Sequence, residues 1–252
     1  MAAELSERLD DLSLNSGEGS ALPPIYTINL DSAVGRRSRM DARFQRMNLK
    51  VTYIKAYSSE DPIVDIYLRN YPDQREIVRR EAACLASHLK ALKAVVNSGE
   101  KGGIIMEDDL LFSPDYVRQA SKKLEMAKAK TKEKGLPLDI LLFGYMAESW
   151  EGSQWLDEKE GLGLYGGANL WGCQCFFVSA EFAKVCLREY SRPFLYLSGR
   201  LTSEMIIRHP QTIFCYPPLI AEECLDSTIR NFEEVTIYHK KIWDSWNFVG
   251  YS

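Results

Sequence analysis

Three adjacent carboxylates, Glu107-Asp108-Asp109, follow the short apolar run Gly103-Ile104-Ile105-Met106. Neighbouring negative charges repel one another and need a counter-charge. A divalent cation such as Mg²⁺ or Mn²⁺, which prefers hard oxygen ligands, can supply it. The alternative is a solvent-exposed turn before a helix, where Asp is common without any metal. Both interpretations stay open on the triplet alone.

A basic cluster is the second candidate for ligand binding. Arg36 and Arg37 lie just after the first predicted strand, where a phosphate can meet the backbone N–H groups that open a helix. Arg39, Arg43 and Arg46 continue at helical spacing, and we expect them to form the solvent-facing side of an amphipathic helix.

Cys84 and His88 are one helical turn apart, which is a possible spacing for two zinc ligands. Zinc needs two more ligands at suitable spacing, and the other cysteines and histidines offer no recognisable pattern. Buried thiols and a core histidine are therefore the favoured interpretation.

The elements that must position these residues alternate between strand and helix. The strongest helix is predicted over residues 76–97, where Leu85, Leu89, Leu92 and Val96 form one apolar stripe. Ser113-Pro114-Asp115 is typical of a helix start, with a hydroxyl cap and proline at the first helical position. The other expected elements are strands over 25–30, 51–56, 103–106 and 138–143, a helix over 36–49, and a loop or a pair of short turns over 57–75.

This alternation predicts an α/β fold with a mostly parallel central sheet flanked by helices. Ligands bind beyond the carboxyl ends of the strands in such sheets, which is where Asn29 and the acidic triplet are expected. The length of 252 residues suits one large domain. We expect a flexible tail over residues 1–22 and a single domain over 23–252, with a nucleotide-binding half to about 145 and an acceptor half from about 146.

Composition narrows the classes of partner. The formal net charge of −4 argues against nucleic acid as a partner, because phosphate backbones need a basic surface. No apolar run approaches the ~18 residues of a membrane span. The first residues lack the basic start and apolar stretch of a signal peptide, so we expect a soluble, cytoplasmic protein. The six cysteines are then expected to be reduced.

Several motifs, in this order, resemble glycosyltransferase family 25, which includes lipooligosaccharide β-1,4-galactosyltransferases and procollagen galactosyltransferases. The helix motif Glu81-Ala82-Ala83-Cys84-Leu85-Ala86-Ser87-His88 is similar to the family's E-x-G-C-x-x-S-H, with Ala83 in place of the usual glycine. Ile104-Ile105-Met106-Glu107-Asp108-Asp109 resembles its I-I-x-E-D-D element. Further matches are Ile28-Asn29-Leu30-Asp31 with Arg36-Arg37, Gly172–Ser179, Pro217–Ile220 and Ser227–Arg230.

The resemblance implies a GT-A-type fold and an inverting transfer of galactose or glucose from a UDP-sugar. The triplet would be the counterpart of the DxD motif, with Asp109 binding Mn²⁺ or Mg²⁺ and Glu107 or Asp108 helping to hold the metal or the ribose. Asn29, Leu30 and Arg36 would lie along the nucleotide, and Ser87 and His88 near its base or ribose.

Inversion also requires a general base for the acceptor hydroxyl. The family's P-V-D-x-x-L helix start is replaced here by Leu201-Thr202-Ser203-Glu204, and Glu204 is the candidate base. Glu148 and Asp226 are the alternatives. The expected partners are a nucleotide sugar and a glycan or hydroxyl acceptor. A catalytically silent interaction module of the same fold and another Mg²⁺-dependent nucleotide enzyme remain the rival functions.

Overall fold

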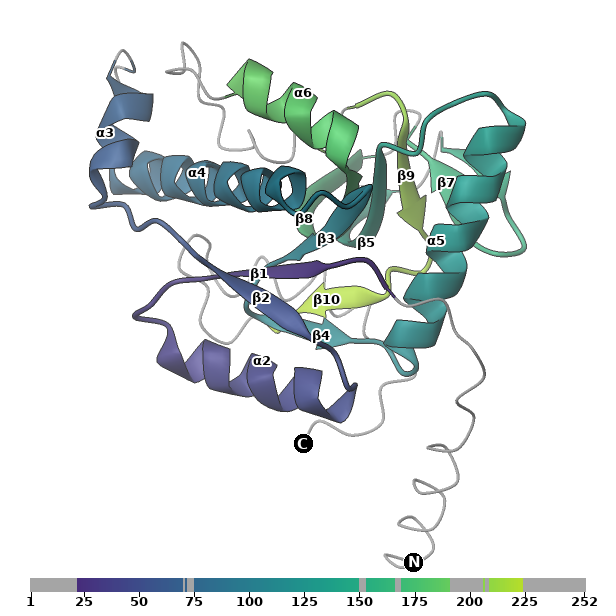
Figure 1. Cartoon of the computed structure of the whole chain (residues 1–252), viewed down its shortest axis with the longest axis horizontal. Helices are drawn as coiled ribbons and strands as arrows, with labels where there is room; N and C mark the ends of the chain where they lie inside the picture. Colours follow the sequence, from purple (N-terminus) through teal and green to yellow (C-terminus); the bar gives the residue numbers. More distant parts are fainter. Residues whose placement is uncertain are drawn as a thin grey trace, which may run out of the picture.

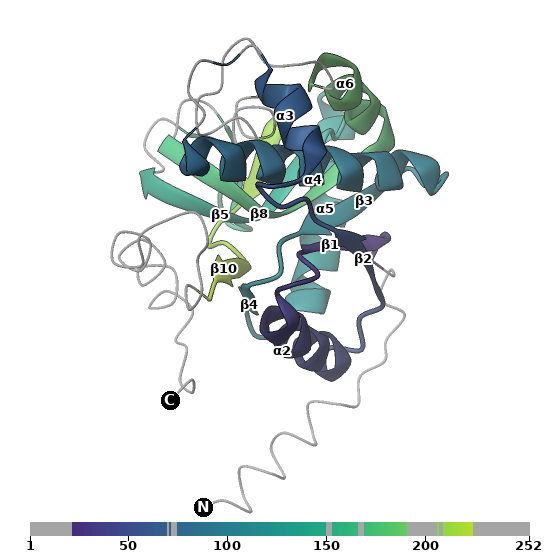
Figure 2. The same cartoon turned by 90° about the vertical axis from the view of Figure 1, so that its left-hand side faces the viewer.

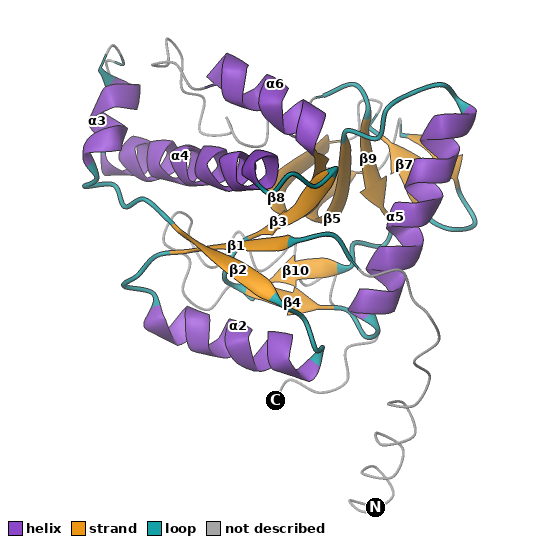
Figure 3. Cartoon of the chain, viewed as in Figure 1, coloured by secondary structure: helices purple, strands orange, loops and turns teal. Residues whose placement is uncertain are grey.

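The computed structural model describes residues 22–69, 71, 75–149, 153–165, 169–190, 206 and 209–223 (Figures 1 and 3). The elements follow one another as β1 (Ile25–Asn29), α2 (Val34–Arg46), β2 (Val51–Lys55), α3 (Pro62–Leu68), α4 (Glu76–Asn97), β3 (Gly102–Met106), β4 (Leu110–Phe112), α5 (Tyr116–Glu133), β5 (Ile140–Ser149), β6 (Gln154–Asp157), β7 (Leu162–Leu164), β8 (Asn169–Ser179), α6 (Ala180–Tyr190), β9 (Thr212–Cys215) and β10 (Ile220–Glu222).

Among the described residues, ten strands form one sheet with the main order β2-β1-β3-β8-β5-β9-β7-β6. Strands β2, β1 and β3 are parallel neighbours, and β8 lies antiparallel between β3 and β5. Strand β10 pairs in parallel with β5 and antiparallel with β4. Within this sheet β4, β7 and β8 oppose the common strand direction, so the expected mostly parallel central sheet of an α/β fold is confirmed. These features agree with the GT-A-type architecture that the sequence motifs imply.

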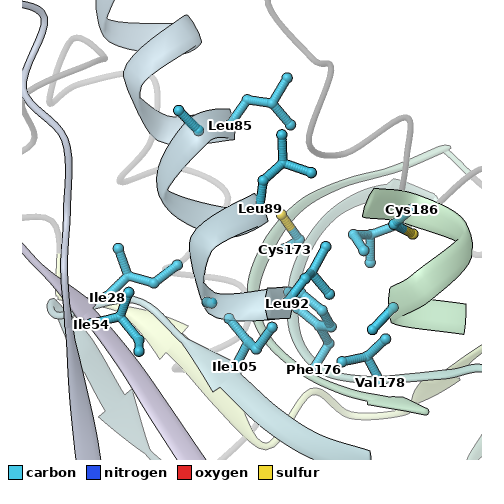
Figure 4. Close-up of a cluster of buried hydrophobic side chains, with 14 of the residues drawn as sticks. Ile28, Ile54, Leu85, Leu89, Leu92, Ile105, Cys173, Phe176, Val178 and Cys186 are labelled. Atoms are coloured by element: carbon cyan, nitrogen blue, oxygen red, sulfur yellow. The ribbon is translucent and has the colours of Figure 1, made fainter. Parts of the chain in front are cut away.

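Helices cover both faces of the sheet (Figure 2). Helix α4 lies over one face beside α6, and its apolar stripe packs on Ile28, Ile105 and Phe176 (Figure 4). Helices α2 and α5 pack on the other face against Ile104 and Met106. Consecutive residues of β3 therefore enter different cores, because side chains alternate along a strand. Helix α4 has the bounds that its apolar periodicity predicts.

Helix α3 lies within the segment 57–75, for which a loop or a pair of short turns was expected. Pro62 occupies its first turn, where a missing N–H costs nothing. Val64, Tyr67 and Leu68 are buried in the same core cluster as the apolar residues of α4. The short helix is thus stabilised by packing on α4, and the polar residues and prolines of the segment 57–75 do not reveal it.

Two other predicted boundaries are wrong. Helix α5 begins at Tyr116, after Asp115 in the left-handed conformation with φ 57°, and no side chain caps it. Strand β5 was expected to end before Gly144 but runs through it. A Cβ at Gly144 would lie 3.0 Å from Cβ of Ile220, so this glycine lets β10 approach and extend the pairing.

Two further expectations, on the cysteines and on membrane-spanning helices, can be compared with the described residues. Five of the six cysteines, those at 84, 173, 175, 186 and 215, are free thiols. Among the described helices, none combines the length and the apolar character needed to cross a bilayer. The expected tail, residues 1–22, lies outside the described residues except for Leu22, which packs against the core.

Candidate functional site

The carboxyl ends of β1 and β3 bring Asn29 and the acidic triplet together. The two strands are parallel neighbours, with Thr27 opposite Met106, so the residues that follow them share one edge of the sheet. Asn29 Nδ2 donates a hydrogen bond to Asp108 Oδ2 at 2.7 Å. Asn29 therefore holds the central carboxylate of the triplet in place.

Arg36 supplies positive charge to the same edge from the first turn of α2. Its Nη1 lies 2.9 Å from Asp108 Oδ1 and 3.0 Å from Asp109 Oδ2. Its side chain is only 13% exposed. Burial lowers the pKa of Arg36, but Asp109 and Asp108 outweigh that effect and raise it above its usual value. The guanidinium is therefore firmly charged and paired to two members of the triplet.

Glu222 completes an acidic cluster with Glu107 and Asp109. Strand β10 pairs antiparallel with β4, with Glu222 opposite Leu110, the residue after the triplet. Carboxylate oxygens of Glu107, Asp109 and Glu222 lie within 4.8 Å of one another. These residues come from two strand ends that are far apart in the sequence, and together they form the acidic cluster discussed below.

The acidic cluster has the properties of a cation site. Asp109 is 8% exposed, and its Oδ1 has no hydrogen-bond partner among the described residues. Burial raises the pKa of Asp109, and the neighbouring Glu222 raises it further, against the opposing effect of Arg36. A buried carboxylate with an unsatisfied oxygen is costly unless something positive binds it. Three convergent oxygen ligands fit Mg²⁺ or Mn²⁺.

His88 lies behind the acidic cluster on α4, stacked against Phe176. Its Nδ1 is 3.0 Å from the carbonyl oxygen of Cys84, which can only accept, so Nδ1 carries the proton. Burial lowers the pKa of His88 to about 4, so the ring is neutral. Its Nε2 is then an unprotonated nitrogen 3.9 Å from Glu107 Oε1. His88 thus adjoins the cluster, and the described cysteines do not form a zinc site with it.

The hydroxyl of Ser87 forms hydrogen bonds with two backbone groups of the protein. Its Oγ donates to the carbonyl of Ala83 at 2.7 Å and accepts from the N–H of Tyr57 at 2.8 Å. Ser87 thereby fixes the chain that leaves β2 to helix α4. Leu30, after β1, packs against the core, and its carbonyl accepts from the N–H of Ala33.

The arginines of α2 were expected to face solvent, and the structure gives them different surroundings. Arg43 is buried and pairs with Glu223, and Arg39 Nε lies 2.9 Å from the same carboxylate. Arg37 is exposed and stacks over the ring of Tyr53, 4.1 Å from its centroid. The expectation is wrong for Arg43, which is buried because the end of β10 places an acid against this helix, whereas the side chain of Arg39 is still 34% exposed.

Sequence reasoning missed Glu222 and Glu223. A usable signal was present, because Leu219-Ile220-Ala221 is a short apolar run followed by two acids, the same pattern as the run before the triplet. The candidate base Glu204 and the alternative Asp226 lie outside the described residues. Glu148 lies in β5, and its side chain is likewise not described.

Comparison with known proteins gives the following similarities. The model of glycosyltransferase family 25 (LPS biosynthesis protein) matches residues 22–142. A glycosyltransferase 25 family member from Anopheles gambiae is 28% identical over 179 residues, which cover 67% of this chain and 29% of that protein. One from Aedes aegypti is 27% identical over 175 residues, covering 66% and 28%. The chain thus spans less than a third of the length of these relatives.

A solved structure of a glycosyltransferase involved in glycosylation of the major capsid of PBCV-1 aligns with 85% of this chain and 100% of that chain. The TM-score is 0.38 and the sequence identity 11%. The segment matched by the family model contains Asn29, Arg36, Ser87, His88 and the acidic triplet. Glu222 lies beyond that segment.

Proposed function

Because the model of glycosyltransferase family 25 matches residues 22–142, we propose that the chain is a member of this family and transfers galactose or glucose from a UDP-sugar to a hydroxyl group of an acceptor, with inversion. The observation that carries the proposal is the acidic cluster. Carboxylate oxygens of Glu107, Asp109 and Glu222 converge within 4.8 Å beyond β3, where an α/β sheet binds its ligand. The unpartnered oxygen of Asp109 supports a cation at that place.

The cluster residues Asp109, Glu107 and Glu222 would hold Mn²⁺ or Mg²⁺. When bound, such a cation supplies positive charge to the diphosphate leaving group as the bond to the sugar breaks. Asp108 is already paired with Asn29 and Arg36, so its role is to position those two side chains.

The nucleotide would lie across the ends of β3, β1 and β2, in that order from diphosphate to base. Arg36, in the first turn of α2, and Asn29, at the end of β1, would contact the diphosphate and ribose region, beside Leu30. Ser87 acts at the third strand end through the backbone of Tyr57, which it fixes, because both of its hydrogen bonds are internal. His88 borders the diphosphate region through Glu107.

The acceptor hydroxyl must lose its proton as its oxygen attacks the anomeric carbon. We assign the base role to Glu204, because a carboxylate can take a proton and the adjacent Ser203 cannot do so unaided. The new bond joins acceptor oxygen to sugar, the bond from sugar to phosphate oxygen breaks, and UDP leaves with its electron pair. The proton ends on Glu204.

The test is UDP release from UDP-galactose and UDP-glucose by the full chain, with and without Mn²⁺, and in the Asp109→Asn variant. We expect cation-dependent release that Asp109→Asn reduces by about 10²-fold or more, the scale of losing one preorganised electrostatic contact. Asp115→Asn is the matched control, since Asp115 is no member of the cluster, pairs with the exposed Arg118, and Asn tolerates its left-handed backbone.

The rival functions give different results in the same assay. UDP-sugar binding without turnover, in a protein that is thermally stabilised by the ligand, would indicate a silent interaction module. Turnover of nucleoside triphosphates with no turnover of UDP-sugars would indicate another Mg²⁺-dependent nucleotide enzyme. Either result overturns the proposal.

A further inference from the structure

Arg36 is the protein's own counter-ion at the acidic cluster. A single nitrogen, Nη1, lies 2.9 Å from Asp108 Oδ1 and 3.0 Å from Asp109 Oδ2. The three side chains are nearly buried together. The positive charge that now balances Asp109 thus comes from the first turn of α2 and contacts Oδ2, next to Oδ1, the oxygen that would face a cation.

Arg36 and a divalent cation compete for Asp109. An oxygen ligand lies about 2.0–2.1 Å from Mg²⁺, so a metal on this carboxylate would be only a few ångströms from the guanidinium. Two positive charges at that separation repel, and burial strengthens the repulsion because water screens it poorly. In the absence of an anion, Arg36 therefore weakens metal binding.

A diphosphate removes this conflict. Its oxygens carry negative charge on several sides, so they can bind the cation on one side and the guanidinium on the other. Arginine presents five N–H donors in a planar fork that matches phosphate oxygens well. Asp108 can keep its hydrogen bond to Arg36 during the exchange, because Asn29 holds its other oxygen at 2.7 Å.

We propose that Arg36 couples the two ligands of the site: it weakens binding of the divalent cation alone and strengthens binding of the cation together with a diphosphate. In the complex, phosphate oxygens replace Asp109 as a partner of the guanidinium. The inference rests on the proposed function for the diphosphate group of the donor. It adds a role for Arg36, which is to link binding of the cation to binding of the diphosphate.

The position of Arg36 suits an exchange of partners with little movement of the backbone. Further along the same helix, Arg39 and Arg43 bind Glu223, whose N–H donates to the carbonyl of Asp109 at 2.6 Å. Helix α2 is thus fixed to the residues that flank the cluster. Only the side chain of Arg36 has to change its contacts.

The experiment measures Mn²⁺ affinity of the full chain by calorimetry, for the natural chain, Arg36→Gln and Arg37→Gln. Each protein is titrated with Mn²⁺ alone, with saturating UDP and with saturating inorganic pyrophosphate, at free Mn²⁺ concentrations corrected for chelation. Arg37→Gln removes the same charge from the neighbouring position, which is exposed and stacked on Tyr53. It therefore controls for the general electrostatic effect of losing one positive charge from α2.

We expect Arg36→Gln to bind Mn²⁺ alone more tightly than the natural chain. UDP and pyrophosphate should each raise the Mn²⁺ affinity of the natural chain roughly 5- to 150-fold, the usual range for coupled sites. That gain should largely disappear in Arg36→Gln and persist in Arg37→Gln. By linkage, Mn²⁺ must raise UDP affinity in the natural chain by the same factor.

Contrary results separate the inference from the proposed function. If Arg36→Gln binds Mn²⁺ alone no more tightly than the natural chain, Arg36 is only a structural ion-pair partner and the inference is wrong, while the proposed transfer can still stand. If UDP couples to Mn²⁺ but pyrophosphate does not, the assignment to the diphosphate is wrong. If no variant binds Mn²⁺ with or without UDP, the metal-dependent function fails and the inference fails with it.

Discussion

Arg43 and Glu223 form a buried ion pair that joins helix α2 to the residue after strand β10. Their side chains are 9% and 10% exposed, and Arg39 binds the same carboxylate at 2.9 Å. The N–H of Glu223 also donates to the carbonyl of Asp109. Helix α2, strand β10 and the acidic triplet are therefore connected through one residue, which lies next to Glu222 of the cluster.

Glu223→Gln should lower the free energy of unfolding by about 3–5 kcal/mol, because removing one partner of a buried pair leaves the other charge uncompensated. Burial raises the pKa of Glu223, but its contacts with Arg43 and Arg39 outweigh that and hold the pKa below its usual value. The carboxylate is thus ionised at neutral pH. Urea unfolding at pH 7 measures the loss.

The matched control is Glu181→Gln. Glu181 also pairs with a basic residue, Lys184, but its side chain is 82% exposed, and exposed pairs add little stability. If both substitutions leave the unfolding midpoint unchanged, the buried pair is not stabilising and the connection between α2 and β10 is wrong.

Gly144→Ala should destabilise the protein by about 1–3 kcal/mol, the usual cost of overpacking a close contact. The added Cβ would lie 3.0 Å from both Cβ and Cγ2 of Ile220, so β10 must shift. Because β10 carries Glu222, the affinity for Mn²⁺ should fall as well. Calorimetry and urea unfolding on the same sample check both effects.

Gly35→Ala is the control for this glycine. Its added Cβ would meet only Arg39 Nη1, at an ordinary 3.7 Å, so stability should not decrease. A Gly144→Ala protein with natural stability and natural Mn²⁺ affinity would contradict the close approach of β10 to β5.

The sequence predicts those elements whose residue patterns are contained within the element itself. Helix α4 repeats its apolar residues along one face over its whole length, so its bounds follow from the sequence. The triplet after β3 is visible because it interrupts an apolar run. Helix α3 escapes prediction because its burial depends on α4, which is formed by residues later in the chain.

The candidate site is predictable only in its first half. Asn29, Arg36 and the triplet lie at strand ends and helix starts that the sequence reveals. Glu222 and Glu223 join them only because β10 pairs with β4, and such long-range pairing leaves no periodic signal in the sequence. The same pairing buries Arg43 against Glu223, which amphipathic spacing alone cannot predict.

Ser87→Ala should lower the free energy of unfolding by about 1–3 kcal/mol, because the N–H of Tyr57 loses its acceptor. Hydrogen exchange at Tyr57 should also become faster. Ser59→Ala, which removes an exposed hydroxyl bound to Glu76, should change neither measurement. A Ser87→Ala protein with natural stability but weaker UDP binding would instead show that the hydroxyl contacts the ligand.

Cys84 should react first with N-ethylmaleimide among the five described cysteines. It is partly exposed, whereas the other four are buried. Burial raises the pKa of Cys186 and of Cys215 to about 12, so very little of the reactive thiolate exists at neutral pH. Peptide mass spectrometry after a short pulse of reagent ranks the sites. Early labelling of Cys186 or Cys215 in the folded protein would contradict their burial.

Glu222→Gln should weaken Mn²⁺ binding without unfolding the protein, because an amide oxygen is neutral and a poorer ligand than a carboxylate. Loss of groups that merely support metal ligands costs about 10- to 100-fold in affinity, so a direct ligand should cost at least about 10-fold. In the metal-free protein the same change removes a charge that raises the pKa of Asp109, so thermal stability at pH 8 should be maintained or increased. Unchanged Mn²⁺ affinity in Glu222→Gln, together with lost affinity in Asp109→Asn, would restrict the cation to the acidic triplet and exclude β10 from the site.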